Sequence, residues 1–221
     1  STDLVHEIRN PLTSLKSASE ILHETESQEQ RNKLIDILNH DVQRIERLIT
    51  DYSQMLKDEV ALSKEKMKKI NLKLIASSVV DDFNNIYEAK RGIQIILKDT
   101  NSQEDFFING IENRIEQIIA NLLDNSISFS DNNKKILVEV FRNDREKIIL
   151  KVIDEGKGFK ETSTKKIFDR FYSNRPDNFG EHSGLGLNIV KNLVDLHGAT
   201  INASNNITQK GANVEIIFPK T

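Results

Sequence analysis

The chain contains no cysteine and no tryptophan, and it has only three prolines among 221 residues. The absence of cysteine excludes disulfides, thiolate metal sites and a cysteine nucleophile, and it fits a reducing compartment. No apolar run reaches the roughly 18–20 residues of a membrane-spanning helix, and no signal peptide is visible. The net charge of −3 lacks the basic excess of most nucleic-acid-binding proteins, so we expect no nucleic acid as a partner.

The remaining composition is typical of a globular chain that buries a core, with 37% hydrophobic and 29% charged residues. The length suits one large domain or two modest ones.

Residues 4–22 have the period of an amphipathic helix. The apolar residues fall on one face of a helical wheel: Leu4, Ile8, Leu12, Leu15 and Leu22. The opposite face carries a polar stripe: His6, Asn10, Thr13 and Ser17. We therefore expect His6 to face solvent or a partner. Pro11 has no N–H, so the carbonyl of Glu7 loses its helical partner and the helix is expected to bend.

A polar turn at 24–30 separates this segment from a second amphipathic helix at 30–58. Asp41 lies within the apolar stripe of the second helix, which nothing in the pattern explains. Two such helices form a hairpin whose apolar face a second copy can cover, so we predict a homodimer built as a four-helix bundle. The charged run 57–69 is typical of a connector.

The pattern after residue 69 alternates between helices and strands. We predict helices at 72–90, 113–130 and 185–198, and strands at 69–71, 93–99 and 211–220. Residues 134–154 indicate two strands around a turn at "NDRE". Strands and helices that are mixed without strict alternation indicate an α+β sandwich.

Three segments of the second half contain residues suited to nucleotide binding. Asn121 and Asn125 stand one helical turn apart, and amide oxygens can bind a Mg²⁺ that phosphates already neutralise; two exposed helical asparagines are the alternative. The segment "DEGKGF" contributes Asp154, whose carboxylate can accept a hydrogen bond from the adenine amine; an ordinary turn after a strand is the alternative. Gly156 and Gly158 would let the backbone approach a flat ligand.

The third segment, "SGLGLNIVKNL", places Gly184 and Gly186 at the start of a helix, where free N–H groups favour phosphate. A tight loop is the alternative. Residues 171–184 are polar, include Pro and Gly, and are typical of a mobile flap.

The order and spacing of these segments resemble the core of sensor histidine kinases. "VHEIRNPLTSL" resembles the H box, "NLLDNSISFS" the N box, "DEGKGF" the G1 box, "IFDRFY" the F box and "GLGL" the G2 box. The amino-acid sequences of 171–187 and of "ISFS" resemble those of the ChvG-type branch of this family. The resemblance implies a dimerisation and phosphotransfer hairpin (1–60), a linker (61–69) and an ATP-binding domain of the GHKL (Bergerat) type (70–221).

The resemblance also implies roles for the H box. His6 resembles the phosphoacceptor, and Glu7 resembles the general base that strengthens it as a nucleophile. Asn10 resembles the residue that orients water when a phosphorylated partner is dephosphorylated. The bend at Pro11 would shift the presentation of His6, with a passive kink as the alternative.

ATP and Mg²⁺ are the cofactors that the resemblance implies. Asn125 would hold Mg²⁺ with help from Asn121, and Asp154 would read adenine. The remaining implied nucleotide residues are Gly156, Gly158, Phe168, Phe171, Gly184, Leu185 and Gly186.

The sequence departs from the family pattern at Ser128, Phe129 and Ser173. Many relatives have a basic residue at the first of these positions, Tyr at the second, and Arg or Lys at the third. Two phosphate-neutralising cations are therefore missing, which puts ATP affinity or rate in doubt. Arg175 is the expected substitute.

The sequence thus predicts ATP-dependent autophosphorylation of His6, relay to an aspartate of a response regulator, and phosphatase activity on that regulator. The alternatives are a weak kinase that acts mainly as a phosphatase, and a dimeric scaffold. The resemblance implies the cytoplasmic portion of an inner-membrane sensor, with any membrane contact made by parts outside this chain.

Overall fold

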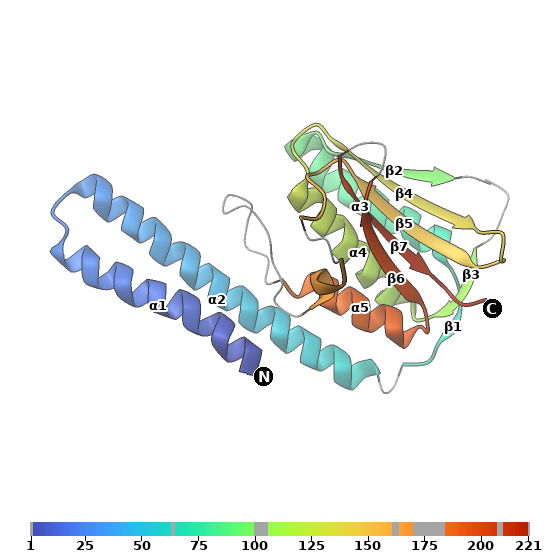
Figure 1. Ribbon diagram of the computed structural model, residues 1–221, viewed down its shortest axis with the longest axis horizontal. Helices are drawn as coiled ribbons and strands as arrows, with labels where there is room; N and C mark the ends of the chain where they lie inside the picture. Colours follow the sequence, from blue (N-terminus) through green and yellow to red (C-terminus); the bar gives the residue numbers. More distant parts are fainter. Residues whose placement is uncertain are drawn as a thin grey trace.

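The computed structural model describes residues 2–62, 65–99, 106–160, 164–169, 184–206 and 210–220 (Figure 1). A helical hairpin comes first, formed by α1 (Thr2–Glu24) and α2 (Gln28–Leu62). Both helices exceed the predicted segments 4–22 and 30–58, and the added residues include good helix formers such as Glu24, Gln28 and Ala61. The first helix continues through Pro11, which is buried.

The hairpin buries one stripe and exposes another. Asp41 and Leu48 of α2 are buried, as are Pro11 and Ala18 of α1. Large apolar side chains of both helices remain exposed: Val5, Leu12, Ile21, Ile35, Ile37, Val42, Ile49 and Leu56. The polar stripe of His6, Asn10, Thr13 and Ser17 is exposed as predicted.

The second half contains two sheets. A two-stranded antiparallel sheet pairs β1 (Lys68–Asn71) with β3 (Phe107–Gly110). The larger sheet has the order β2-β4-β5-β7-β6. Its strands are β2 (Gln94–Asp99), β4 (Lys135–Arg142), β5 (Ile148–Asp154), β6 (Thr200–Asn205) and β7 (Ala212–Ile217). Among the described strands of this sheet, β2 and β4 pair in parallel and the other neighbours pair antiparallel.

Three helices, α3 (Leu72–Arg91), α4 (Glu112–Phe129) and α5 (Gly186–Leu196), lie against one face of the larger sheet (Figure 1). The core lies between these layers, and Ile115, Ile118 and Leu150 are among its fully buried side chains. The structure therefore confirms a helical hairpin followed by an α+β sandwich. None of the described helices is long and apolar enough to cross a lipid bilayer.

The start and end of α3 follow from single residues. The side chain of Asn71 accepts hydrogen bonds from the backbone N–H of Lys73 (3.1 Å) and of Leu74 (3.4 Å), which caps the first turn. Gly92 has φ 62° and ends the helix in the left-handed conformation that glycine adopts without strain.

Three elements were not predicted from the sequence: β3, β6 and the short 3₁₀ helix η1 (Thr164–Phe168). β6 is an edge strand whose sequence, "TINASN", is largely polar because only part of its surface meets the core. β3 has four residues, too few to establish an alternating pattern.

Candidate functional site

Asp154 ends β5 and is only 4% exposed. Its Oδ1 atom accepts hydrogen bonds from the backbone N–H of Gly156 (2.9 Å) and of Ala212 (2.9 Å). Burial raises the pKa of this carboxyl above its ordinary value, and the hydrogen bonds from Ala212, Gly156 and Ser126 oppose that rise. Both backbone bonds go to Oδ1, and the carboxylate also accepts a hydrogen bond from Ser126, so a ligand that donates a hydrogen bond would use the acceptor capacity that remains.

The backbone around Asp154 is packed so closely that side chains are excluded. A Cβ atom on Gly156 would lie 2.6 Å from the carbonyl oxygen of Phe129, at the end of α4. A Cβ atom on Gly211 would lie 1.8 Å from the carbonyl oxygen of Asp154. Glycine at these positions therefore brings α4, β5 and β7 together around one carboxylate.

Gly158, the second glycine of "DEGKGF", has φ 73° and lies beside Asn205 of β6. The Asn205 side chain accepts a hydrogen bond from the Phe159 backbone N–H (2.6 Å) and donates one to the Phe159 carbonyl (2.9 Å). This amide holds the loop after Asp154 against the edge of the sheet.

Asn121 and Asn125 lie one turn apart on α4, and both are half-buried. The Asn121 side chain donates to the Gln117 carbonyl (2.9 Å). Its Oδ1 atom lies 3.3 Å from the position that a Cβ atom would take on Gly186, the first residue of α5. The structure thus brings Asn121, one of the two predicted metal residues, to the start of the helix predicted to bind phosphate.

The start of α5 is built from Gly184, with φ 72°, and from Leu185, which is fully buried. The side chain of Asn188 donates to the carbonyl of Phe168 (2.9 Å), which ties η1 to α5. Phe168 packs against the core. Free N–H groups at this helix start favour an anionic ligand.

Two of the predicted nucleotide residues, Phe171 and Arg175, lie outside the described residues, as does most of the predicted flap at 171–184. Ser128 is described and buried, and its hydroxyl donates to the Asp124 carbonyl (2.7 Å). A neutral hydroxyl thus stands at the position where many relatives have a positively charged side chain.

The hairpin carries the other predicted residues. His6 and Asn10 are exposed on α1, and Glu7 is half-buried. Oε2 of Glu7 lies 3.5 Å from Nη2 of Arg44 on α2. Arg44 could not be predicted from the sequence because the pairing depends on the register of the two helices, which their polar turn does not fix.

Ser126 and Ala212 were also missed as neighbours of Asp154. Ser126 follows Asn125 and lies four residues after buried Leu122, which places both on one face of α4. This helical spacing is the one sequence signal that Ser126 faces the interior. Ala212 contributes only its backbone, and no side-chain pattern could identify it.

Two family models match the chain. The model described as "Histidine kinase-, DNA gyrase B-, and HSP90-like ATPase" matches residues 110–221. The "His Kinase A (phospho-acceptor) domain" model matches residues 1–61.

Curated relatives include two proteins named Sensor protein ChvG. The one from Rhizobium meliloti is 36% identical over 211 residues, which cover 93% of this chain and 36% of the relative. The one from Agrobacterium fabrum is 34% identical over 217 residues, which cover 96% of this chain and 36% of the relative. Both agree with the ChvG-type resemblance, and the chain spans about a third of their length.

Solved structures of histidine kinases are also similar to this chain. The histidine kinase ThkA in complex with response regulator protein TrrA has a TM-score of 0.69 and 26% identity, and the match covers 100% of this chain and 60% of that chain. The Acinetobacter baumannii histidine kinase AdeS has a TM-score of 0.64 and 20% identity, with 98% of each chain covered, and it supports the fold alone.

Proposed function

Because the chain belongs to the histidine kinase family, we propose that it transfers the γ-phosphoryl group of ATP to His6 and then to an aspartate of a response regulator. The observation that carries the proposal is the buried carboxylate of Asp154, held through Oδ1 by Gly156 and Ala212. Its other oxygen suits the amine of adenine.

The chemistry at His6 is a displacement at phosphorus. One imidazole nitrogen forms a bond to the γ-phosphorus, the bond between that phosphorus and the β,γ-bridging oxygen breaks, and ADP leaves. Glu7 accepts the proton of the other imidazole nitrogen. The exposure of His6 on α1 supports this role, since the nucleophile must enter a site on another domain. Positioning and charge neutralisation account for most of the rate.

The residues at the nucleotide site fit ATP and Mg²⁺. Asn125, assisted by Asn121, would hold Mg²⁺, which neutralises phosphate charge when bound. Gly184, Leu185 and Gly186 would shape the phosphate side, since they form the start of α5.

The second copy of the chain is the partner that we propose for the hairpin. The exposed residues Ile35, Val42, Ile49 and Leu56 are spaced seven apart along α2. A seven-residue repeat forms a continuous seam along a helix, and a four-helix bundle buries such a seam.

Phosphatase activity on the regulator is the second candidate function. Asn10 is exposed on the same stripe as His6, and Ser128 supplies no cation for the kinase reaction. These observations favour a chain that both phosphorylates and dephosphorylates its regulator. We also propose that the chain is the cytoplasmic portion of an inner-membrane sensor protein, since the two relatives are named sensor proteins.

The test of the kinase reaction is incubation of the chain with γ-labelled ATP and Mg²⁺. Phosphohistidine is labile in acid and stable in base, so the label should be lost in acid and retained in base. A label with the opposite stability would identify another acceptor.

A further inference from the structure

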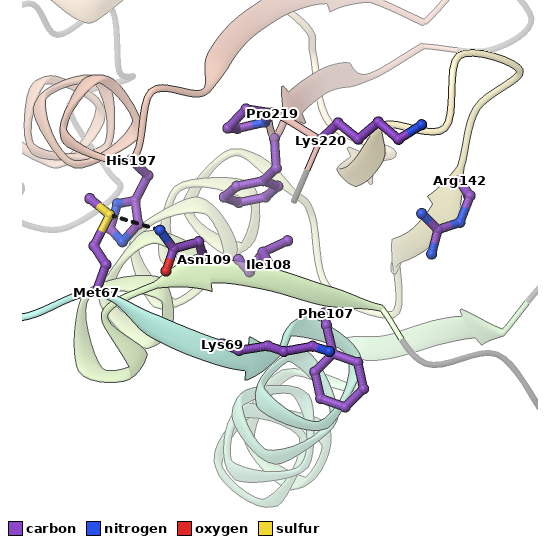
Figure 2. Close-up of a pocket in the computed structure, with 10 residues that line it drawn as sticks. Met67, Lys69, Phe107, Ile108, Asn109, Arg142, His197, Pro219 and Lys220 are labelled. Carbon is purple, nitrogen blue, oxygen red and sulfur yellow. Dashed lines mark hydrogen bonds between the residues drawn. The ribbon is translucent and has the colours of Figure 1, made fainter.

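A cavity of about 740 Å³, half open to solvent, lies between the two-stranded sheet β1–β3 and the segment that follows β7 (Figure 2). None of its lining residues belongs to the candidate nucleotide site. Its volume is within the range of pockets that bind small organic molecules.

One end of the cavity is closed by a neutral histidine. Nε2 of His197 accepts the backbone N–H of Ile111 (3.1 Å), and Nδ1 donates to the carbonyl of Leu193 (2.7 Å). Burial lowers the pKa of this imidazole, and the hydrogen bond to Leu193 opposes the shift only in part. With both nitrogens occupied, His197 offers neither a metal ligand nor a charge. Met67 lies beside it (Figure 2).

The charged groups of the lining all have one sign. Lys69, Arg142 and Lys220 contribute to the wall, and the described lining contains no Asp or Glu. Figure 2 shows Arg142 and Lys220 at the end of the cavity opposite His197 and Met67. Glu146 partly balances Arg142 at 3.8 Å, whereas no described carboxylate forms an ion pair with Lys69 or Lys220.

Much of the remaining lining is apolar. It includes Phe107, Ile108, Phe218 and Pro219, beside the polar residue Asn109. The ammonium group of Lys69 lies 4.6 Å from the centre of the Phe107 ring, so charge and aromatic surface are adjacent. A small ion would leave the apolar lining exposed to water. A wholly apolar molecule would leave the lysine and arginine side chains without a counter-ion.

We propose that this cavity binds a small amphipathic anion, with a carboxylate or phosphate group at the end formed by Arg142 and Lys220 and an apolar body against Phe107 and Pro219. Met67 and Lys69 adjoin the connection from the hairpin, in which Glu65 pairs with Arg114 of α4 (2.9 Å). A ligand in the cavity would therefore contact the junction between the two domains.

The test is calorimetric titration of the whole chain with octyl phosphate, while a non-hydrolysable ATP analogue and Mg²⁺ occupy the nucleotide site. We expect one molecule to bind, at least about tenfold more tightly than inorganic phosphate or octanol, because only octyl phosphate satisfies both parts of the cavity. Affinity for octyl phosphate no higher than for inorganic phosphate would overturn the proposal.

The Arg142→Gln, Lys220→Gln double variant should bind octyl phosphate about tenfold more weakly, because it removes the two cations at one end. Lys90→Gln, an exposed lysine on α3 outside the cavity, is the control and should leave binding unchanged. Unchanged binding by the double variant would contradict the site and would place the octyl chain elsewhere, for example on the exposed apolar face of the hairpin. Cosedimentation with phosphatidic acid vesicles, lost in the double variant, would identify a bilayer lipid as the source of the anion; its absence would identify a free molecule.

Discussion

The carboxylate of Asp154 and the backbone N–H of Ala212 are joined by a 2.9 Å hydrogen bond, although they lie far apart in the sequence. The same oxygen, Oδ1, accepts the N–H of Gly156. Two backbone segments therefore fix the orientation of one buried acid through Oδ1, and the Ser126 side chain also hydrogen-bonds this carboxylate. The proposed reading of adenine uses the acceptor capacity that these three bonds leave on the carboxylate.

Asp154→Asn should weaken adenine nucleotide binding by about 10²-fold. The amide can keep its oxygen on the Gly156 and Ala212 N–H groups, which turns its NH₂ group toward the amine of adenine and leaves two donors facing each other. Calorimetry with an ATP analogue measures the change. An affinity equal to that of the parent would mean that Asp154 does not read the base.

The same variant should be no less stable than the parent without nucleotide at pH 7. The pKa of Asp154 is raised above 3.8 in the folded state, so the folded chain binds this proton more readily than the unfolded chain between the two values. The parent therefore loses stability as the pH rises through the raised pKa, and Asn avoids that loss. The advantage of the variant should shrink as the pH falls through that pKa in urea unfolding. An advantage that grows toward acid pH would contradict the sign.

The five sequence motifs and most of the helices and strands could be predicted from the sequence, because each depends on residues that are close together in the chain. The i, i+4 pair of Asn121 and Asn125 and the glycines of "DEGKGF" are local signals of this kind. The contact of Ala212 with Asp154 depends on the pairing of β5 with β7, which no local pattern encodes. The register that places Arg44 beside Glu7 likewise depends on how two long helices pack.

Asn10→Ala should leave the phosphorylation of His6 within about twofold of the parent and should slow the loss of phosphate from the regulator by about tenfold or more. The side chain is one helical turn from His6, and the role that we propose for it, orienting water for dephosphorylation, is separate from the attack on ATP. Ser17→Ala, on the same exposed stripe, is the control. Equal loss of both activities would indicate a structural role for Asn10.

Arg175→Ala should lower the autophosphorylation rate by about tenfold or more, and Arg175→Lys should retain part of it. The developing charge on the transferred phosphoryl group needs a cation, and Ser128 and Ser173 supply none. The rate and the nucleotide affinity are both measured. A rate for the Ala variant within about twofold of the parent would exclude Arg175 as the substitute and favour the weak-kinase alternative.

Glu65→Gln should destabilise the nucleotide-binding domain by about 1–3 kcal/mol. The guanidinium of Arg114 is largely buried at the start of α4, 2.9 Å from the Glu65 carboxylate, and would lose its charged partner. Urea unfolding measures the effect. Glu29→Gln removes an exposed ion pair with Lys33 and should cause no measurable change. Equal free energies of unfolding for the two variants would show that the Glu65–Arg114 pair contributes no more to stability than the exposed Glu29–Lys33 pair.

The central claim is that His6 receives the phosphoryl group, and labelling of His6→Gln with γ-labelled ATP tests it most directly. His23→Gln, which replaces another exposed histidine of α1, is the matched control. We predict that His6→Gln carries no label while it binds the ATP analogue as the parent does, and that His23→Gln is labelled normally. Undiminished label on His6→Gln would contradict the assignment of His6 as the phosphoacceptor.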